Sequence, residues 1–144
     1  MVTYKIGELA ERSGCLVETV RYYERIGLLP EPVRAANNYR VYNEEHADRL
    51  QFIRHCRALD MSIDEIRELV EIRSQPDSNC IGVNELLDRH IGHITERIAA
   101  LHALEAQLRD LRSCCNTAKA SSDCGILHAI SDIDPEKTRL IQSH

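Results

Sequence analysis

The chain has 144 residues, of which 43% are hydrophobic and 28% charged, as in ordinary globular proteins. This length fits one domain, or a small domain with an appendage, and is too short for most elaborate enzyme folds. No hydrophobic run approaches the roughly 18 residues of a membrane span, and the N-terminus lacks a signal peptide's hydrophobic region. We therefore expect a cytosolic protein without a membrane partner.

Charge permits a nucleic-acid partner without establishing one. The formal net charge is −5, yet residues 34–57 carry five arginines against three acidic residues. A protein that binds DNA must neutralise phosphates, so the distribution of charge matters more than its total. On this criterion the first half of the chain can bind DNA, and sequence motifs are needed to establish that it does.

Two short helices and a hairpin are predicted at the start of the chain. Hydrophobic residues at helical spacing predict helices over residues 6–12 and 17–26, with Ser13-Gly14 as the turn between them. Val20 and Tyr23 fall on the hydrophobic face of the second helix. Two helices joined by such a turn are typical of a helix-turn-helix. In RAANNYRVY, Asn37-Asn38 can adopt the positive φ of a hairpin turn, which predicts a two-stranded wing.

Three further helices are predicted. Those over 43–59 and 62–73 begin at residues that cap helices well, Asn43 and Ser62. After a linker at 75–79, a helix of about 30 residues over 83–112 would span about 45 Å. Its stripe of hydrophobic residues contains Leu87, Ile91, Ile94, Ile98, Leu101, Leu104, Leu108 and Leu111. A small domain cannot cover such a stripe, which favours an antiparallel dimerisation coiled coil over a long core helix.

Three of the six cysteines form a candidate metal site. Cysteines in a cytosolic chain are thiols or metal ligands more often than disulfides. Cys80 precedes the long helix, and Cys115 and Cys124 flank an eight-residue loop after it. In an antiparallel dimer, Cys80 of one protomer would meet Cys115 and Cys124 of its partner. Three thiolates favour thiophilic ions such as Zn, Cu(I), Cd, Hg or Pb.

The other cysteines and the histidines receive different assignments. Cys114 is a candidate fourth ligand, whereas Cys15 and Cys56 lie in hydrophobic, helical contexts and are expected to be packing residues. Four histidines at helical positions are not assigned as ligands: His55, His90, His93 and His102.

Most of the chain resembles one family. KIGELAERSG, VETVRYYERIGLLPEP and NNYRVYNEEHADRLQFIRHCRALDMSIDEIRELV resemble the MerR family of dimeric transcriptional regulators, over essentially residues 4–130. The expected fold is mainly α, with a winged helix-turn-helix DNA-binding domain at 1–76 and a linker and antiparallel dimerisation coiled-coil helix at 77–113. A C-terminal metal-binding loop with a short helix at 114–130 and a flexible tail at 131–144 complete it.

The resemblance also implies which residues contact DNA. Residues 17–25 would form the recognition helix, with further contacts to phosphates from the wing. The residues implied are Glu18, Thr19, Arg21 and Tyr22 in the helix and Tyr39 and Arg40 in the wing. Tyr23 and Phe52 are expected to be core aromatic residues instead.

The cysteine spacing is similar to that of the family's heavy-metal branch. CRALDM and Cys124-Gly125-Ile126-Leu127 resemble its cadmium and lead group, CadR and PbrR, which implies Cd(II) or Pb(II), with Zn(II) or Hg(II) as alternatives. Cys114-Cys115 resembles zinc regulators of the ZntR type, but Lys119 stands where those have a histidine, so a second, bridged zinc ion is not expected.

The mechanism implied by the family is activation by DNA distortion. A homodimer would bind a pseudo-palindromic promoter, repress it when metal-free, and underwind the DNA for RNA polymerase when metal-bound. Efflux and resistance genes would be the targets.

Two other functions remain open. One is a thiol redox sensor of the same architecture, in which Cys114, Cys115 and Cys124 form disulfides. The other is a metal-sequestering protein without a DNA role. An enzyme is not expected, because no acid, base or nucleophile constellation is visible beyond the thiols.

Overall fold

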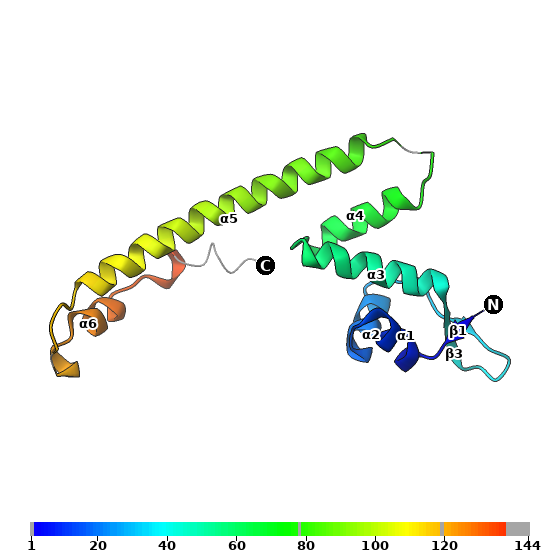
Figure 1. The fold of residues 1–144 in the computed structure, drawn as a ribbon, viewed down its shortest axis with the longest axis horizontal. Helices are drawn as coiled ribbons and strands as arrows, with labels where there is room; N and C mark the ends of the chain where they lie inside the picture. The colour runs from blue at the N-terminus through cyan, green and yellow to red at the C-terminus, as the bar shows by residue number, and fades with distance from the viewer. Residues whose placement is uncertain (1, 78, 119, 138–144) are drawn as a thin grey trace. The chain divides into compact units, whose positions relative to one another are not determined.

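The computed structural model describes residues 2–77, 79–118 and 120–137 (Figure 1). Contacts divide the chain into two compact units, Met1–Val83 and Asn84–His144. The helices are α1 (Ile6–Ser13), α2 (Val17–Arg25), α3 (Glu44–Ala58), α4 (Ile63–Arg73), α5 (Ile81–Ser113) and α6 (Gly125–Ser131), and the strands are β1 (Thr3–Tyr4), β2 (Val33–Arg34) and β3 (Arg40–Asn43). Two short 3-10 turns, η1 (Ser121–Asp123) and η2 (Pro135–Lys137), follow α5 and α6 respectively. The mainly α fold is confirmed.

The helix-turn-helix forms where it was predicted. Gly14 ends α1 with a φ of +69°, a conformation that glycine adopts without steric cost. Val20 and Tyr23 of α2 are both buried, as their spacing predicted. Phe52, expected in the core, is only half-buried, and the Arg73 guanidinium lies over its ring at 4.5 Å from the centroid in a cation–π contact.

The wing is confirmed and has a third strand beside it. β2 and β3 pair antiparallel, with Val33 opposite Val41, and Asn38 has a φ of +68° in the connecting turn. β1 pairs with the other edge of β3, so the strand order is β1-β3-β2. The Tyr4 hydroxyl of β1 donates a hydrogen bond to Glu44, which holds this strand against the start of α3.

Capping residues start α3 and α4 at the predicted positions. The Asn43 side chain accepts from the His46 backbone N–H at 3.2 Å, and Ser62 Oγ accepts from the Glu65 N–H at 3.2 Å. Hydrophobic side chains from the helices α1 to α4, from β3 and from the segment after α2 form one core in the first unit. Its most deeply buried members are Leu9, Val20, Leu28, Tyr42, Leu50, Ile53 and Ile66.

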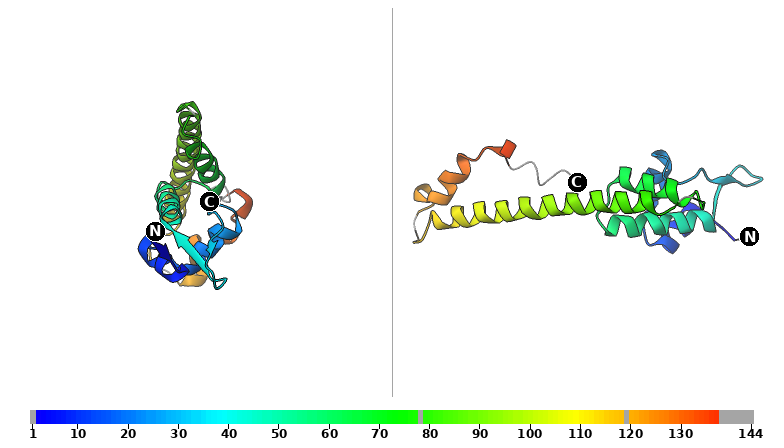
Figure 2. Two further views of the ribbon diagram at one scale, coloured as in Figure 1. Left: turned by 90° about the vertical axis from the view of Figure 1, so that its right-hand side faces the viewer. Right: turned by 90° about the horizontal axis from the view of Figure 1, so that it is seen from above.

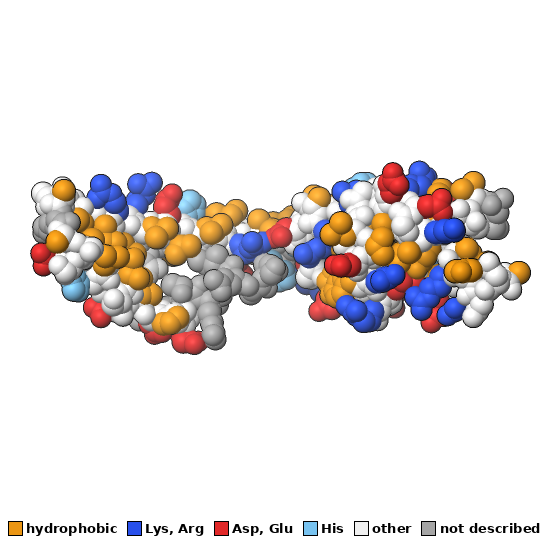
Figure 3. All heavy atoms as spheres, turned by 90° about the horizontal axis from the view of Figure 1, so that it is seen from below, with side chains coloured by type: hydrophobic (Ala, Val, Ile, Leu, Met, Phe, Trp, Pro, Cys, Tyr) orange, Lys and Arg blue, Asp and Glu red, His pale blue; other side chains and the backbone are white. Residues whose placement is uncertain are grey.

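The second unit consists of most of α5 together with α6. The 33 residues of α5 run without a break over about 50 Å, which confirms the predicted long helix (Figure 2). α6 returns beside the C-terminal part of α5 (Figures 1 and 2). Hydrophobic side chains gather on the surface over this part of the unit (Figure 3). None of the helices in the described residues has the length and hydrophobicity to span a bilayer.

Candidate nucleic-acid interface and metal centre

The helix α2 turns its polar residues outward. Glu18, Arg21 and Tyr22 are exposed and Thr19 is half-buried. The Arg25 guanidinium lies 5.6 Å from the centroid of the Tyr22 ring. The four helix residues assigned to DNA contact therefore lie away from the core, and the contacts themselves remain a prediction.

Two hollows flank the recognition helix and the wing, and Arg21 and Arg40 line both of them. One hollow also contains Arg25 and Arg34, while the other extends past Tyr39. Guanidinium groups bind phosphate with two parallel hydrogen bonds. The first hollow has four of them against two carboxylates, Glu24 and Glu31, so its excess of positive charge suits a phosphate backbone.

Arg34 is a candidate contact that the sequence analysis did not assign. It pairs with Arg40 across the wing, and its Nη1 donates to the Asn38 carbonyl at 3.2 Å. The signal in the sequence is the hairpin itself, because residues opposite each other in paired strands project from the same face of the sheet.

Tyr42 joins the wing to the recognition helix. Its hydroxyl donates to Glu24 Oε1 at 2.9 Å, and its ring packs edge-on against His46 with 5.2 Å between centroids. Burial first, and then the hydrogen bond to Glu24, raise the pKa of Tyr42 to about 12. The wing and α2 are therefore linked by a neutral, hydrogen-bonded phenol.

Helix α3 holds the backbone on both sides of α2. Three of its side chains bind carbonyl oxygens in the turns that flank the recognition helix. Arg54 binds Ser13 at 2.6 Å, Arg49 binds Leu28 at 3.3 Å, and His46 Nε2 lies 3.2 Å from both Pro30 and Glu31. Because carbonyl oxygens only accept, His46 Nε2 is the nitrogen that donates to them, while Nδ1 lies 3.1 Å from the Asn43 backbone nitrogen and 2.8 Å from Asn43 Oδ1.

A close backbone approach shapes the cysteine loop. An ideal Cβ on Gly125, the first residue of α6, would lie 2.5 Å from the Cys114 carbonyl oxygen, so only glycine fits there. The backbone of Gly125, one residue after Cys124, therefore lies against the backbone of Cys114 at the end of α5. Within the described residues, the sulfur atoms of Cys114, Cys115 and Cys124 do not form a group at ligand distance. Cys115 and Cys124 are half-buried and Cys114 is exposed.

The thiols at this end make local hydrogen bonds. Cys115 Sγ donates to the Thr117 carbonyl at 3.2 Å, and Cys114 Sγ donates to the Asp110 carbonyl at 3.5 Å. The Cys115 carbonyl accepts from Arg112 Nη1 at 2.8 Å. Accessible sulfur donors at one end of a helix suit a thiophilic ion. Lys119, within this loop, lies outside the described residues, as does the chain from 138 onward.

Cys80 belongs to the first unit and is exposed. It follows Asn79, whose Oδ1 accepts from the Ile81 N–H at 3.0 Å and so caps the start of α5. The meeting of Cys80 with the Cys115 and Cys124 of a partner remains a prediction.

The two remaining cysteines have the surroundings of packing residues. Cys56 is buried and Cys15 is half-buried. Burial raises the pKa of both thiols, which disfavours the thiolate that metal binding needs.

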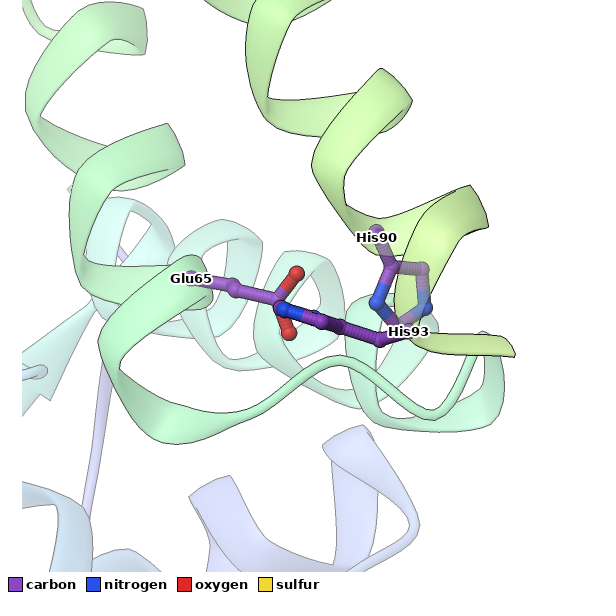
Figure 4. Close-up of side chains that lie close together, drawn as sticks. All are labelled: Glu65, His90 and His93. Atoms are coloured by element: carbon purple, nitrogen blue, oxygen red, sulfur yellow. The ribbon is translucent and has the colours of Figure 1, made fainter. Parts of the chain in front are cut away.

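His90 and His93 lie one turn apart on α5 (Figure 4). Glu65, also drawn there, belongs to α4, where its Oε1 accepts from the Ser62 N–H at 2.9 Å and completes the capping box. That these histidines have no metal role remains a prediction.

Comparisons with known proteins assign the family. Residues 4–71 match the family of MerR HTH family regulatory proteins, and residues 47–111 match the family described as MerR, DNA binding. The chain is 46% identical to the ZntR homolog of Haemophilus influenzae, an HTH-type transcriptional regulator, over 75% of this chain and 80% of that protein.

Two crystal structures with bound ions are also similar. PbrR691 from Ralstonia metallidurans CH34, in complex with lead(II), is 50% identical with a TM-score of 0.79, covering 88% of this chain and 98% of that one. MerR from Bacillus megaterium MB1, in complex with mercury(II), is 30% identical with a TM-score of 0.69, covering 90% and 100%. With the helix-turn-helix, wing and long helix in place, the chain belongs to the MerR family of DNA-binding transcriptional regulators and is not an enzyme.

Proposed function

We propose that this protein is a metal-responsive transcriptional regulator that binds promoter DNA as a homodimer. On binding Cd(II) or Pb(II) it distorts the DNA and activates heavy-metal resistance or efflux genes for RNA polymerase. The observation that carries the proposal is the loop flanked by Cys115 and Cys124 after α5, at whose ends the backbone of Gly125 approaches that of Cys114. The 50% identity to a regulator crystallised with lead(II) supports the choice of ion.

The proposed ligands are Cys80 of one protomer and Cys115 and Cys124 of its partner, with Cys114 as a candidate fourth. Three thiolates repel one another and are stable together only around a cation, and soft sulfur favours soft or borderline ions. Zn(II) and Hg(II) are the alternatives, supported by the similarity to the ZntR homolog and to the mercury-bound MerR.

The homodimer is supported by the hydrophobic stripe of α5. Ile98, Leu101 and Leu108 are each about half exposed within the single chain, at 51%, 50% and 55%. Exposed hydrophobic residues at heptad spacing along a helix of this length are typical of a coiled coil, and a second copy of α5 would cover them.

The energetics allow ion binding to control DNA shape. Bending a promoter-sized site costs several kcal/mol, whereas structural metal sites bind with about 10 kcal/mol or more. For the ion to control DNA shape in this way, the protein needs only to bind the ion more tightly in its activating conformation than in its repressing conformation. Cys80 is suited to this because it lies where the DNA-binding unit meets α5.

Serine variants of the ligands test the proposal. We expect Cys80→Ser, Cys115→Ser and Cys124→Ser each to retain operator binding in gel shifts and to abolish metal-dependent transcription. The measurement is a promoter-reporter titration against Cd, Pb, Zn, Hg and Cu salts. Cys15→Ala is the matched control and should respond like the wild type.

The other outcomes are equally informative. Loss of operator binding in all three variants would identify a structural metal, and an unchanged metal response would remove the ligand assignment. Activation by an oxidant without any metal would identify a thiol redox sensor. Cys114→Ser decides whether Cys114 is a fourth ligand.

A further inference from the structure

The turn that carries Cys80 is fixed in the first unit by two neighbours in sequence. On one side, Asn79 caps α5 through the Ile81 N–H. On the other, Gly82 lies against α4: an ideal Cβ on Gly82 would be 3.2 Å from Ile72 Cδ1 and 3.9 Å from Cγ1. The first turn of α5 is therefore seated on the Ile72 side chain because residue 82 has no side chain of its own.

This contact leaves little room. At 3.2 Å, an added methyl group would be closer than about nine in ten real Cβ contacts, so either Ile72 would give by a few tenths of an ångström or the turn would move with it. The bond lengths of a sound metal–thiolate site lie within about 0.2 Å of their standard values. A shift of the turn is thus on the scale to which a thiolate ligand at Cys80 would be sensitive.

The same contact leads toward the DNA-reading elements. Ile72 is in the last turns of α4, which is anchored in the core of the first unit through Ile66 and Leu69, both buried. Because packed interiors transmit small displacements, a movement of the Cys80 turn reaches the core through α4.

We propose that Gly82 is a positioning residue for the metal response. Its bare Cα lets Ile72 hold the Cys80 turn against α4, so that displacement of Cys80 on ion capture passes to the DNA-binding unit. This inference rests on the proposed function, since it takes Cys80 to be a ligand.

Gly82→Ala is the test, and Gly92→Ala is its matched control. Both substitutions raise helix propensity in α5, but a Cβ on Gly92 would meet nothing within 4 Å. The double variant Ile72→Val/Gly82→Ala removes the Cδ1 methyl that the new side chain would meet. The readouts are metal-free operator affinity by fluorescence anisotropy, the Cd(II) midpoint of transcription in vitro, and amide hydrogen exchange of residues 79–85 in the metal-free protein.

We expect Gly82→Ala to raise the Cd(II) midpoint about tenfold, the loss typical of disturbing a residue that supports a ligand. Metal-free operator affinity should stay within about twofold of the wild type. Hydrogen exchange at the start of α5 should change in Gly82→Ala. In the double variant Ile72→Val/Gly82→Ala, both the Cd(II) midpoint and the hydrogen exchange should return to the wild-type values. A merely structural role of Gly82 would lower operator affinity as well.

An unchanged midpoint in Gly82→Ala, or no rescue by Ile72→Val, would overturn this inference while the wild type still responds to Cd(II). A wild type that responds to none of the thiophilic ions would overturn the proposed function, and this inference with it.

Discussion

Tyr42 contributes both to the hydrophobic core and to the contact between the wing and the recognition helix. Its ring is fully buried in the core, and its hydroxyl reaches the Glu24 carboxylate on the recognition helix. A buried hydroxyl stays bonded because leaving it without a partner costs about 1–3 kcal/mol. Tyr42 therefore contributes to the stability of the unit and to the placement of the wing.

The first prediction concerns the pH dependence of this residue. The pKa of Tyr42 is raised from 10.0 to about 12, so the folded state favours the protonated phenol. The associated stability is present below pH 10 and is lost as the pH rises toward 12. We expect urea unfolding to show this loss in the wild type, and a smaller loss in Tyr42→Phe.

At neutral pH, Tyr42→Phe should lower the free energy of unfolding by about 1 kcal/mol, the net value of one hydrogen bond. Tyr39→Phe is the control, since Tyr39 is 69% exposed. Equal alkaline losses in Tyr42→Phe and the wild type would show that Tyr42 is not the titrating group.

Side-chain contacts to distant backbone were beyond sequence reasoning. The spacing of Val20 and Tyr23 predicted their burial correctly, because helical periodicity is local. His46 was not identified, since its carbonyl partners, Pro30 and Glu31, are 16 and 15 residues away in the chain. The same holds for Gly125, whose role depends on the backbone of Cys114.

At the scale of elements, the helices were the most predictable parts. Asn43 and Ser62 set the starts of α3 and α4 within one residue, since capping depends only on neighbours in sequence. Strand β1 has two residues and no alternating pattern, and it exists through pairing with Asn43 and Tyr42. Such a strand is defined by its partner, so the sequence alone does not reveal it.

The second prediction concerns the turn of the wing. Asn38 has a φ of +68°, which glycine tolerates and β-branched residues do not. We expect Asn38→Gly to preserve thermal stability and operator affinity. Asn38→Val should cost about 1–2 kcal/mol of stability and weaken operator binding, because Tyr39 and Arg40 follow directly.

Thermal unfolding and anisotropy with operator DNA measure these two effects. If Asn38→Val bound DNA as tightly as Asn38→Gly, the wing would not contribute to the interface through this turn.

At the scale of the whole molecule, the long stripe of α5 and the proposed dimer belong together. The sequence predicted the helix because its hydrophobic residues recur over many turns, and the structure confirms it from Ile81 to Ser113. The sequence alone does not determine which of Cd(II), Pb(II), Zn(II) and Hg(II) the protein binds. All four accept thiolate ligands, and coordination number and loop shape separate them.

The third prediction tests the dimer. We expect Leu101→Glu/Leu108→Glu to sediment as a monomer, because it places two charges in the proposed seam, and to lose operator binding with it. Ala99→Glu adds a charge on the opposite face of α5, where Ala99 is exposed, and should remain a dimer. Sedimentation velocity distinguishes the two. If Leu101→Glu/Leu108→Glu remained a dimer, the dimer interface would have to lie outside this stripe of α5.

The three side chains with which α3 holds the flanks of α2 have a consequence for how a promoter is read. Arg54, Arg49 and His46 bind the backbone on both sides of α2 to α3, and Tyr42 binds the wing to α2, so we expect these parts to move together. Chemical footprints within each half-site should then be the same in the repressing and activating states. Only the base pairs between the half-sites should change their reactivity.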